Sequence, residues 1–336
     1  FSTRVNDASG AITLGASWPD NAWFLNEHRT ISGAAMFPGA GYIELARQAL
    51  REAGVQRPFE VRELVMLAPL AAATAGPTRV EVVLSPTDFG YALEVRRQFD
   101  DADRDKNDQP KWATTAQAQL VLRSPAAALP VDVANALSTS PNRGAIRSRQ
   151  QDHLRLGPRW NVAQAVQSGP QQSVALLEVP DEFVSDLDGF VLHPALIDIG
   201  LCFALEQVPG YNGDALWVPI SAQSIVVHQP DGPRDQLRSA TVVTTIQPGS
   251  SQAAGFATFD VVFIDTAEEV AITVTGFTMK RLAGRLNLNP PTSEAVTESN
   301  VAHGRPVTKA EEALRHNVSQ GIRAAEGAAA FELALI

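Results

Sequence analysis

The apolar positions of this chain follow a helical period first and a strand period afterwards. A helix is predicted after Pro38, because proline is tolerated at a helix start and the apolar residues that follow recur at steps of three and four. These residues are Tyr42, Leu45, Ala46, Ala49 and Leu50. Segments with alternating or β-branched residues then predict strands, at 60–70, 79–85, 91–99 and 112–123.

The second half of the chain repeats this order. An apolar helix is predicted over 195–207, directly after His193 and Pro194. Strand-like segments follow it at 215–228, 237–246, 255–265 and 270–282. One helix followed by several strands, twice over, indicates an internally duplicated α+β fold in which an antiparallel sheet wraps each helix.

Polar stretches divide the chain into units. The prolines and small residues of 126–143 predict a linker between an N-terminal unit, 1–125, and a C-terminal unit, 144–284. Residues 285–336 are predicted to be a connector with a short helical tail that leads toward a following domain. The polar run 100–111 predicts a hairpin loop, with a charged binding element as the alternative.

Composition narrows the class of protein. The 336 residues are 45% hydrophobic, which is ample for a core, and the net charge of −10 argues against a nucleic-acid partner. The single cysteine, Cys202, excludes an internal disulfide and a cysteine-based zinc site. No segment approaches the about 18 consecutive apolar residues of a membrane span. We therefore expect a soluble cytoplasmic protein, and the missing initiator methionine suggests a fragment of a longer chain.

The candidate chemistry narrows to one histidine and one aspartate. No two of the six histidines have the spacing of a helical metal site, so we expect no metal. The motifs of serine hydrolases, Rossmann cofactor sites and phosphate-binding loops do not occur in the sequence. What remains is His28, upstream of the first predicted helix, and Asp198, inside the second.

Each of these two residues has two interpretations. The apolar neighbours of Asp198 indicate a desolvated carboxyl whose raised pKa suits proton donation near neutrality. The alternative is a solvent-facing aspartate in the first turn, where it complements the helix dipole. His28 is a candidate general base, because imidazole titrates near physiological pH; the alternative is a histidine that only forms hydrogen bonds within its turn.

Three motifs together resemble the dehydratase domains of modular polyketide synthases. The HxxxGxxxxP motif of that family resembles the stretch from His28 through Gly33 to Pro38. Its HPALLD motif resembles His193 to Asp198, and its YGPxF motif resembles Leu156 to Trp160. The similarity extends over about residues 20–283 with the motifs in the family's order.

The resemblance implies a fold and a reaction. The fold is a double hotdog, in which two sheets each wrap a long helix within one chain. The reaction is elimination of water from a β-hydroxyacyl thioester held on the phosphopantetheine of an acyl carrier protein, with no other cofactor. His28 would remove the α-proton, Asp198 would protonate the leaving hydroxyl, and the Gly39 N–H would bind the thioester oxygen, with Gly33 and Pro38 shaping the turn. The expected partners are the carrier protein, neighbouring synthase domains and a second copy in a homodimer.

Three departures from the family pattern bear on the activity. Four residues instead of three separate His28 from Gly33, so Ser32 occupies the usual glycine position. Cys202 stands four residues after Asp198, where the family usually has glutamine or histidine, and Leu156 replaces the tyrosine of the third motif. Simple dehydration is the first expectation. The alternatives are a dehydratase that also forms an oxygen heterocycle by oxa-Michael addition, and a catalytically silent, dimerising scaffold domain; Asp198 argues against a pure double-bond isomerase.

Two further sets of residues are predicted from these motifs. The apolar substrate tunnel is predicted to include Cys202, Leu156, Pro158, Trp160, His193, Pro194 and Phe37, with Trp23, Phe24, Met36, Leu192 and Leu201 as further candidates that would otherwise be plain core. A basic patch for the acidic carrier protein is predicted from Arg29, Arg147, Arg149, Arg155 and Arg159.

Overall fold

The computed structural model describes residues 1–99, 111–125, 131–228 and 237–282. Within these ranges thirteen strands form one sheet, and two short strands form a second, separate sheet. The large sheet belongs to a unit that extends from Phe1 to Arg281. Two predicted segments lie outside the described residues. They are the hairpin loop at 100–111, apart from Lys111, and the connector and tail at 285–336.

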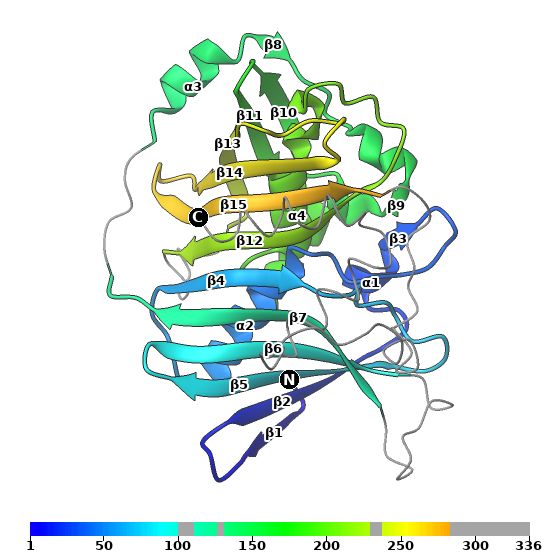
Figure 1. The fold of residues 1–336 in the computed structure, drawn as a ribbon, viewed down its shortest axis with the longest axis vertical. Coiled ribbons are helices and arrows are strands. Elements are labelled where there is room, and N and C mark those ends of the chain that lie inside the picture. Colours follow the sequence, from blue (N-terminus) through cyan, green and yellow to red (C-terminus); the bar gives the residue numbers. More distant parts are fainter. Residues whose placement is uncertain (100–110, 126–130, 229–236, 283–336) are drawn as a thin grey trace, which may run out of the picture. The chain divides into compact units, whose positions relative to one another are not determined.

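The large sheet is antiparallel and consists of two halves (Figure 1). The first half contains, in sheet order, β1 (Thr3–Asn6), β2 (Ile12–Trp18), β5 (Thr78–Thr87), β6 (Gly90–Gln98), β7 (Trp112–Leu122) and β4 (Phe59–Met66). The second half contains β12 (Trp217–Val227), β15 (Val270–Arg281), β14 (Phe256–Ile264), β13 (Ser239–Ile246), β11 (Gln172–Glu178), β10 (Ala163–Ser168) and β8 (Asn142–Arg143). The small sheet pairs β3 (His28–Thr30) with β9 (Leu154–Leu156).

The helices are fewer and shorter than the strands. The α-helices are α1 (Trp23–Asn26), α2 (Gly41–Glu52), α3 (Val133–Thr139) and α4 (Pro194–Cys202). The 3₁₀ helices are η1 (Arg149–Asp152), η2 (Pro158–Trp160), η3 (Asp181–Asp188) and η4 (Phe203–Gln207).

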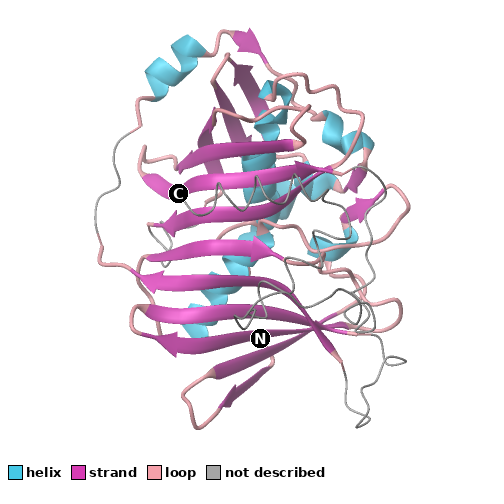
Figure 2. Cartoon of the chain, viewed as in Figure 1, coloured by secondary structure: helices cyan, strands magenta, loops and turns pink. Residues whose placement is uncertain are grey.

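Each half of the sheet packs against its own helix, and both helices lie on the same face of the sheet (Figure 2). The strands bury alternate residues toward this face; in β5, for example, Thr78, Val80, Val82 and Leu84 are buried. Most of α2 is buried against the first half, and α4 is apolar on nearly all sides, which suits a helix surrounded by protein. The arrangement confirms the predicted α+β double hotdog.

The two halves are joined by the antiparallel ladder between β4 and β12. Its register pairs Val61 with Ile225 and Phe59 with Val227. All four side chains are buried in the common hydrophobic core. The ladder therefore turns two sheets into one and makes their cores continuous.

The predicted helices differ from the observed ones at their ends. α2 begins at Gly41, because the N–H groups of Gly41, Tyr42 and Ile43 bind carbonyls three residues back, which is the tighter 3₁₀ pattern. Pro38 therefore opens this lead-in turn and not the α-helix. The second predicted helix ends at Cys202 and continues as η4.

The predicted linker contains regular structure. Within 126–143 the structure describes 131–143, where α3 and β8 lie. Asp132 caps α3, since its carboxylate accepts a hydrogen bond of 2.9 Å from the Asn135 N–H. The division of the chain into units at 125 and 144 stays a prediction.

A buried carboxylate ties α2 to the chain that leads into α4. Glu44 accepts hydrogen bonds of 2.8 Å from the Nε and Nη2 atoms of Arg47 and from Gln48 Nε2. It also accepts from the backbone N–H of Leu192, at 3.1 Å. Because Glu44 and Arg47 are almost fully buried, the pair is stable only when its hydrogen bonds are satisfied, and one of these crosses between the two halves.

His193 lies at a second contact between the halves. Its imidazole stacks on the indole of Trp23 in α1, with ring centroids 5.1 Å apart, and it is completely inaccessible to solvent. Nε2 lies 3.7 Å from Asp186 Oδ2 in η3. Burial nevertheless lowers the pKa of His193 to about 4, which keeps the ring neutral at physiological pH.

In the part of the chain that the structure describes, no helix is long and apolar enough to cross a membrane. The same residues contain no group of three or more histidine, cysteine, aspartate or glutamate side chains that could hold a metal ion.

Replacing Glu44 with glutamine should lower the free energy of unfolding by about 3 kcal/mol, because the buried Arg47 guanidinium loses its charged partner. Urea unfolding followed by circular dichroism measures the change. Glu52→Gln is the matched control, since Glu52 ends the same helix and is exposed, and it should change stability by less than about 0.5 kcal/mol. Equal losses in the two variants would contradict this account.

Stability should fall as the pH drops from 6.5 to about 4, because the unfolded chain binds a proton on His193 in this window and the folded chain does not. The full effect of this one group is about 3 kcal/mol. His193→Phe keeps an aromatic ring on Trp23 and removes the titration. Urea unfolding at pH 7 and pH 4 should show a smaller loss in the variant, and parallel losses would refute the assignment.

Candidate active site

His28 is held in one tautomer by its backbone surroundings. It begins β3, and its Nδ1 lies 3.0 Å from the carbonyl oxygen of Met36. Because a carbonyl only accepts, Nδ1 carries the proton and Nε2 keeps its lone pair. The ring is 6% exposed, so this lone pair lies in a largely water-free environment.

The extra residue between His28 and Gly33 is absorbed in a hairpin loop. The N–H of Thr30 binds the carbonyl of Ala34 at 2.9 Å, and the N–H of Met36 binds the carbonyl of His28 at 3.0 Å. Three residues, 31–33, close the hairpin, and Gly33 takes the left-handed φ of 95° typical of such loops. The imidazole therefore lies beyond the backbone hydrogen bonds that close the loop.

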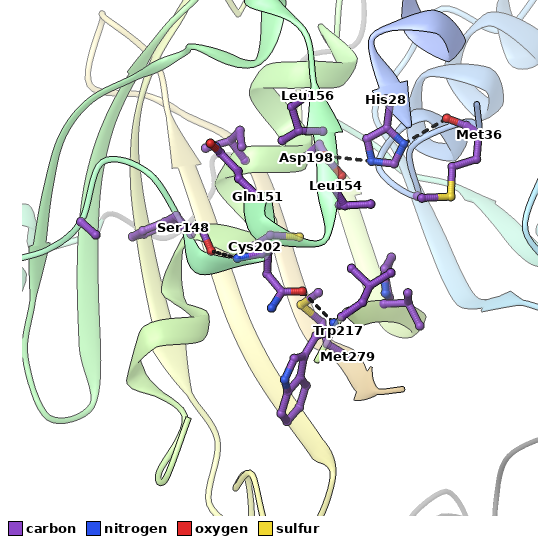
Figure 3. Close-up of a pocket in the computed structure, with 18 of the residues that line it drawn as sticks. His28, Met36, Ser148, Gln151, Leu154, Leu156, Asp198, Cys202, Trp217 and Met279 are labelled. Carbon is purple, nitrogen blue, oxygen red and sulfur yellow. Dashed lines mark hydrogen bonds and ion pairs between the residues drawn. The ribbon is translucent and has the colours of Figure 1, made fainter. Parts of the chain in front are cut away.

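Asp198 faces His28 from the other half of the molecule. It lies in α4, and its Oδ2 is 3.9 Å from His28 Nε2, too far for a direct hydrogen bond (Figure 3). Oδ2 accepts a hydrogen bond of 2.9 Å from the indole N–H of Trp160. The Asp198 side chain is 14% exposed.

Burial is the main influence on the ionisation of Asp198. It raises the pKa of the carboxyl, while the positive charge of a protonated His28 and the Trp160 hydrogen bond act in the opposite direction. The protonated carboxyl is therefore favoured relative to an exposed aspartate. This environment supports the buried interpretation of Asp198 over the solvent-facing one.

Both residues line one cavity. The cavity also contains Met36 and Gly39 from the first half, and one face of α4, where Asp198, Ile199 and Cys202 lie together. Figure 3 shows His28 and Asp198 on the same side of this space, with Trp217 and Met279 further along it. Burial raises the pKa of the Cys202 thiol, so cysteine adds a neutral group to the wall. The lining is mostly apolar, which suits an acyl chain.

Gly39 contributes a backbone N–H to the same cavity. In the described part of the chain this N–H donates no hydrogen bond. A side chain at this position is excluded, because a Cβ would lie 2.7 Å from Pro219 Cγ and 3.2 Å from Met66 Sδ. Glycine therefore suits this position, where its N–H group has no partner among the described residues.

The structure brings only part of the predicted tunnel together. Of the predicted tunnel residues, Leu156, Cys202 and Met36 line the cavity. The others do not line it: Phe37, Trp160, His193, Pro194, Leu192 and Leu201 are buried, Trp23 and Phe24 are partly buried, and Pro158 is exposed. Phe37, for example, stacks on Trp18 with ring centroids 5.0 Å apart. Aromatic character alone does not separate tunnel from core.

Several lining residues come from a polar stretch that carried no sequence signal. Ser148, Gln150 and Gln151 of this stretch line the cavity. Gln150 is fixed there by three long-range bonds: its Nε2 donates to Tyr211 Oη and to the Ala215 carbonyl, and its Oε1 accepts from the Trp217 N–H. A local sequence pattern does not predict contacts between residues that are more than 60 positions apart in the chain.

The predicted basic patch is only partly available at the surface. Arg159 is enclosed, because it donates to Asp186 and Glu27 and stacks over Trp23. Arg29 donates to the carbonyl of Gly33 at 2.7 Å. Arg155 is exposed and lies opposite Arg29 in the ladder of β3 and β9. The remaining two, Arg147 and Arg149, are exposed near single carboxylates.

Comparison with protein families gives two matches that together cover most of the described chain. Residues 2–99 match the model described as polyketide synthase dehydratase domain. Residues 125–288 match the model described as polyketide synthase dehydratase N-terminal domain.

Curated relatives are much longer than this chain. It is 25% identical over 254 residues to the spectinabilin polyketide synthase system protein NorA' of Streptomyces orinoci, covering 71% of this chain and 6% of that protein. It is 29% identical over 231 residues to the mycoketide-CoA synthase of Mycobacterium tuberculosis, covering 66% of this chain and 5% of that protein. The chain thus spans about a twentieth of each relative.

Solved structures share the fold. The dehydratase domain from the CurF module of the curacin polyketide synthase matches with a TM-score of 0.71 and 17% identity, over 83% of this chain and 96% of that one. A trans-AT polyketide synthase dehydratase domain from Brevibacillus brevis matches with a TM-score of 0.70 and 19% identity, with the same coverage. These structures share the fold, and the two family models show that this chain belongs to the polyketide synthase dehydratase domains.

Proposed function

We propose that this domain eliminates water from a β-hydroxyacyl thioester carried on the phosphopantetheine of an acyl carrier protein. One observation carries the proposal. The lone pair of His28 Nε2 and the carboxyl of Asp198 face each other at 3.9 Å on the wall of one mostly apolar cavity. A base and an acid on the same side of a bound chain suit a syn elimination.

The two residues divide the proton transfers. Nε2 of His28 removes the proton from the α-carbon, and that electron pair forms the new double bond as the bond from the β-carbon to oxygen breaks. Asp198 donates its proton to the departing hydroxyl, which leaves as water. The imidazolium and the carboxylate then return to their starting states when the proton passes from Nε2 to Asp198.

Gly39 is the proposed donor to the thioester oxygen. Negative charge develops on this oxygen as the α-proton is removed. The free N–H of Gly39 precedes α2 and lines the cavity with His28, so it is suited to stabilise that charge. No separate cofactor takes part, since the substrate brings its own thioester.

The partners follow from the proposed substrate and from the relatives. An acyl carrier protein must deliver the thioester, and the exposed Arg155 and Arg147 are proposed contacts for its acidic surface. The relatives are polyketide synthases many times longer than this chain, which supports neighbouring synthase domains as partners. A homodimer stays a proposal from the family resemblance.

Cyclisation after dehydration is the second candidate function. Leu156 and Cys202 both line the cavity, so the two positions that depart from the family pattern lie beside the reacting groups. Neither side chain is a strong hydrogen-bond donor, and a distal hydroxyl of the substrate would meet little competition for His28. Addition of that hydroxyl to the new double bond would give an oxygen heterocycle.

His28→Ala and Asp198→Asn should each lower kcat for water elimination by about 10² to 10⁴-fold, because each removes one proton transfer. Loss of 18 mass units from a β-hydroxyacyl carrier-protein substrate measures the reaction. His228→Ala is the control, since His228 hydrogen-bonds Thr273 outside the cavity and should leave kcat unchanged. A wild-type domain that is inert toward every diastereomer would favour a silent scaffold.

Cys202→Gln and Cys202→Ser separate the two activities. We expect both variants to retain simple elimination within about tenfold, because His28 and Asp198 are untouched. With a substrate that carries a distal hydroxyl, loss of a cyclic product in the glutamine variant alone would assign the cysteine to cyclisation. Absence of a cyclic product from the wild type would refute the second candidate. Mass spectrometry follows the loss of water. Enoyl absorbance follows formation of the open-chain product.

A further inference from the structure

Trp160 makes the only hydrogen bond to the Asp198 carboxyl within the described residues. Its indole N–H donates to Oδ2 at 2.9 Å, while His28 Nε2 is 3.9 Å from the same oxygen. The other polar neighbour is Cys202, one turn along α4, whose thiol is a weak donor and forms no hydrogen bond with the carboxyl.

An indole differs from other polar partners in one respect, because its N–H group donates and never accepts. The oxygen that it binds must therefore accept, and in a neutral carboxyl the unprotonated oxygen is the stronger acceptor of the two. Asp198 Oδ1 has no hydrogen-bond partner in the described structure and is left to carry the proton. An amide partner lacks this selectivity, since it either donates or accepts.

Trp160 is itself rigidly held. It ends η2 and is 2% exposed. Its ring packs edge-on to Trp23 with centroids 6.0 Å apart and lies 5.5 Å from the ring of His28. The start of η2 is fixed by Glu27, whose carbonyl accepts from the Gly157 N–H at 2.8 Å and whose carboxylate accepts from the Arg159 N–H at 3.1 Å.

We propose that Trp160 is a positioning residue that makes Oδ2 of Asp198 the accepting oxygen and directs the acidic proton to Oδ1, where it meets the leaving hydroxyl. This role rests on the proposed dehydratase function. It assigns to the indole a part in the reaction although the indole lies outside the cavity lining.

The test replaces the N–H group of the Trp160 indole. Incorporation of 3-benzothienylalanine at position 160 keeps the bicyclic shape and exchanges the N–H for sulfur. We expect kcat to fall about 10- to 100-fold, which corresponds to one hydrogen bond to an ionisable group, with KM nearly unchanged. Trp160→Phe should act in the same direction. The same analogue at Trp18, which packs on Phe37 outside the cavity, is the control and should leave kcat unchanged.

The pH profile separates positioning from packing. The carboxyl must hold a proton to act as the acid, so kcat falls as the pH rises through its pKa. The indole hydrogen bond favours the charged form, and its removal should move this alkaline limb to higher pH. The titratable groups that face Asp198 are His28 from β3 and Cys202 from α4, and neither is altered by the replacement.

A second readout does not depend on turnover. Titration of protein containing ¹³C-labelled aspartate, followed by NMR, should show a higher pKa for Asp198 in the analogue than in the wild type, with Asp198→Asn identifying the signal. An unchanged carboxyl titration together with an unchanged kcat would overturn the role of Trp160. If the wild type eliminates no water, the proposed function fails; a shifted titration would then still support the hydrogen bond, and an unshifted one would refute it.

Discussion

The antiparallel ladder between β4 and β12 is the constraint on which the proposed active site depends. Each half of the sheet buries its own helix, and neither half contains both of the groups that face each other across 3.9 Å. His28 belongs to the first half and Asp198 to the second. The ladder fixes their separation, and the small pairing of β3 with β9 sets His28 opposite Leu156 beside the cavity. Folding of the whole unit is therefore a condition for assembling the site.

The two facing residues are both buried, and their hydrogen-bond partners distinguish them. Each is mostly buried, and each has one hydrogen bond that fixes its state: a carbonyl holds the proton on His28 Nδ1, and an indole holds Asp198 Oδ2 as an acceptor. Burial favours the neutral form of the Asp198 carboxyl. An imidazole with a free Nε2 lone pair is a base and a neutral carboxyl is an acid, so the two groups suit opposite roles. His193 is buried and neutral as well, and its ring stacks on Trp23.

The sequence was informative where local pattern determines structure. The alternating strands of both halves, the two buried helices and the pair His28 and Asp198 follow from periodicity, motif and resemblance. The strands β1, β2, β3, β8, β9, β10 and β11 were not predicted. They are between two and seven residues long, and pairing with neighbouring strands defines them. Tunnel residues were predicted poorly for the same reason. Gln150 lines the cavity through bonds to residues more than 60 positions away, whereas the aromatic Phe37 packs into the core.

The hairpin that closes with Gly33 affects how related chains can be detected from sequence motifs. Hydrogen bonds of Thr30 with Ala34, and of His28 with Met36, close a loop of three residues, 31–33, so the additional residue is accommodated within this loop. A search pattern that demands a fixed interval between the histidine and the glycine would reject this chain. A pattern anchored on the paired residues on either side of the loop, and free in the number of residues between them, would retain it.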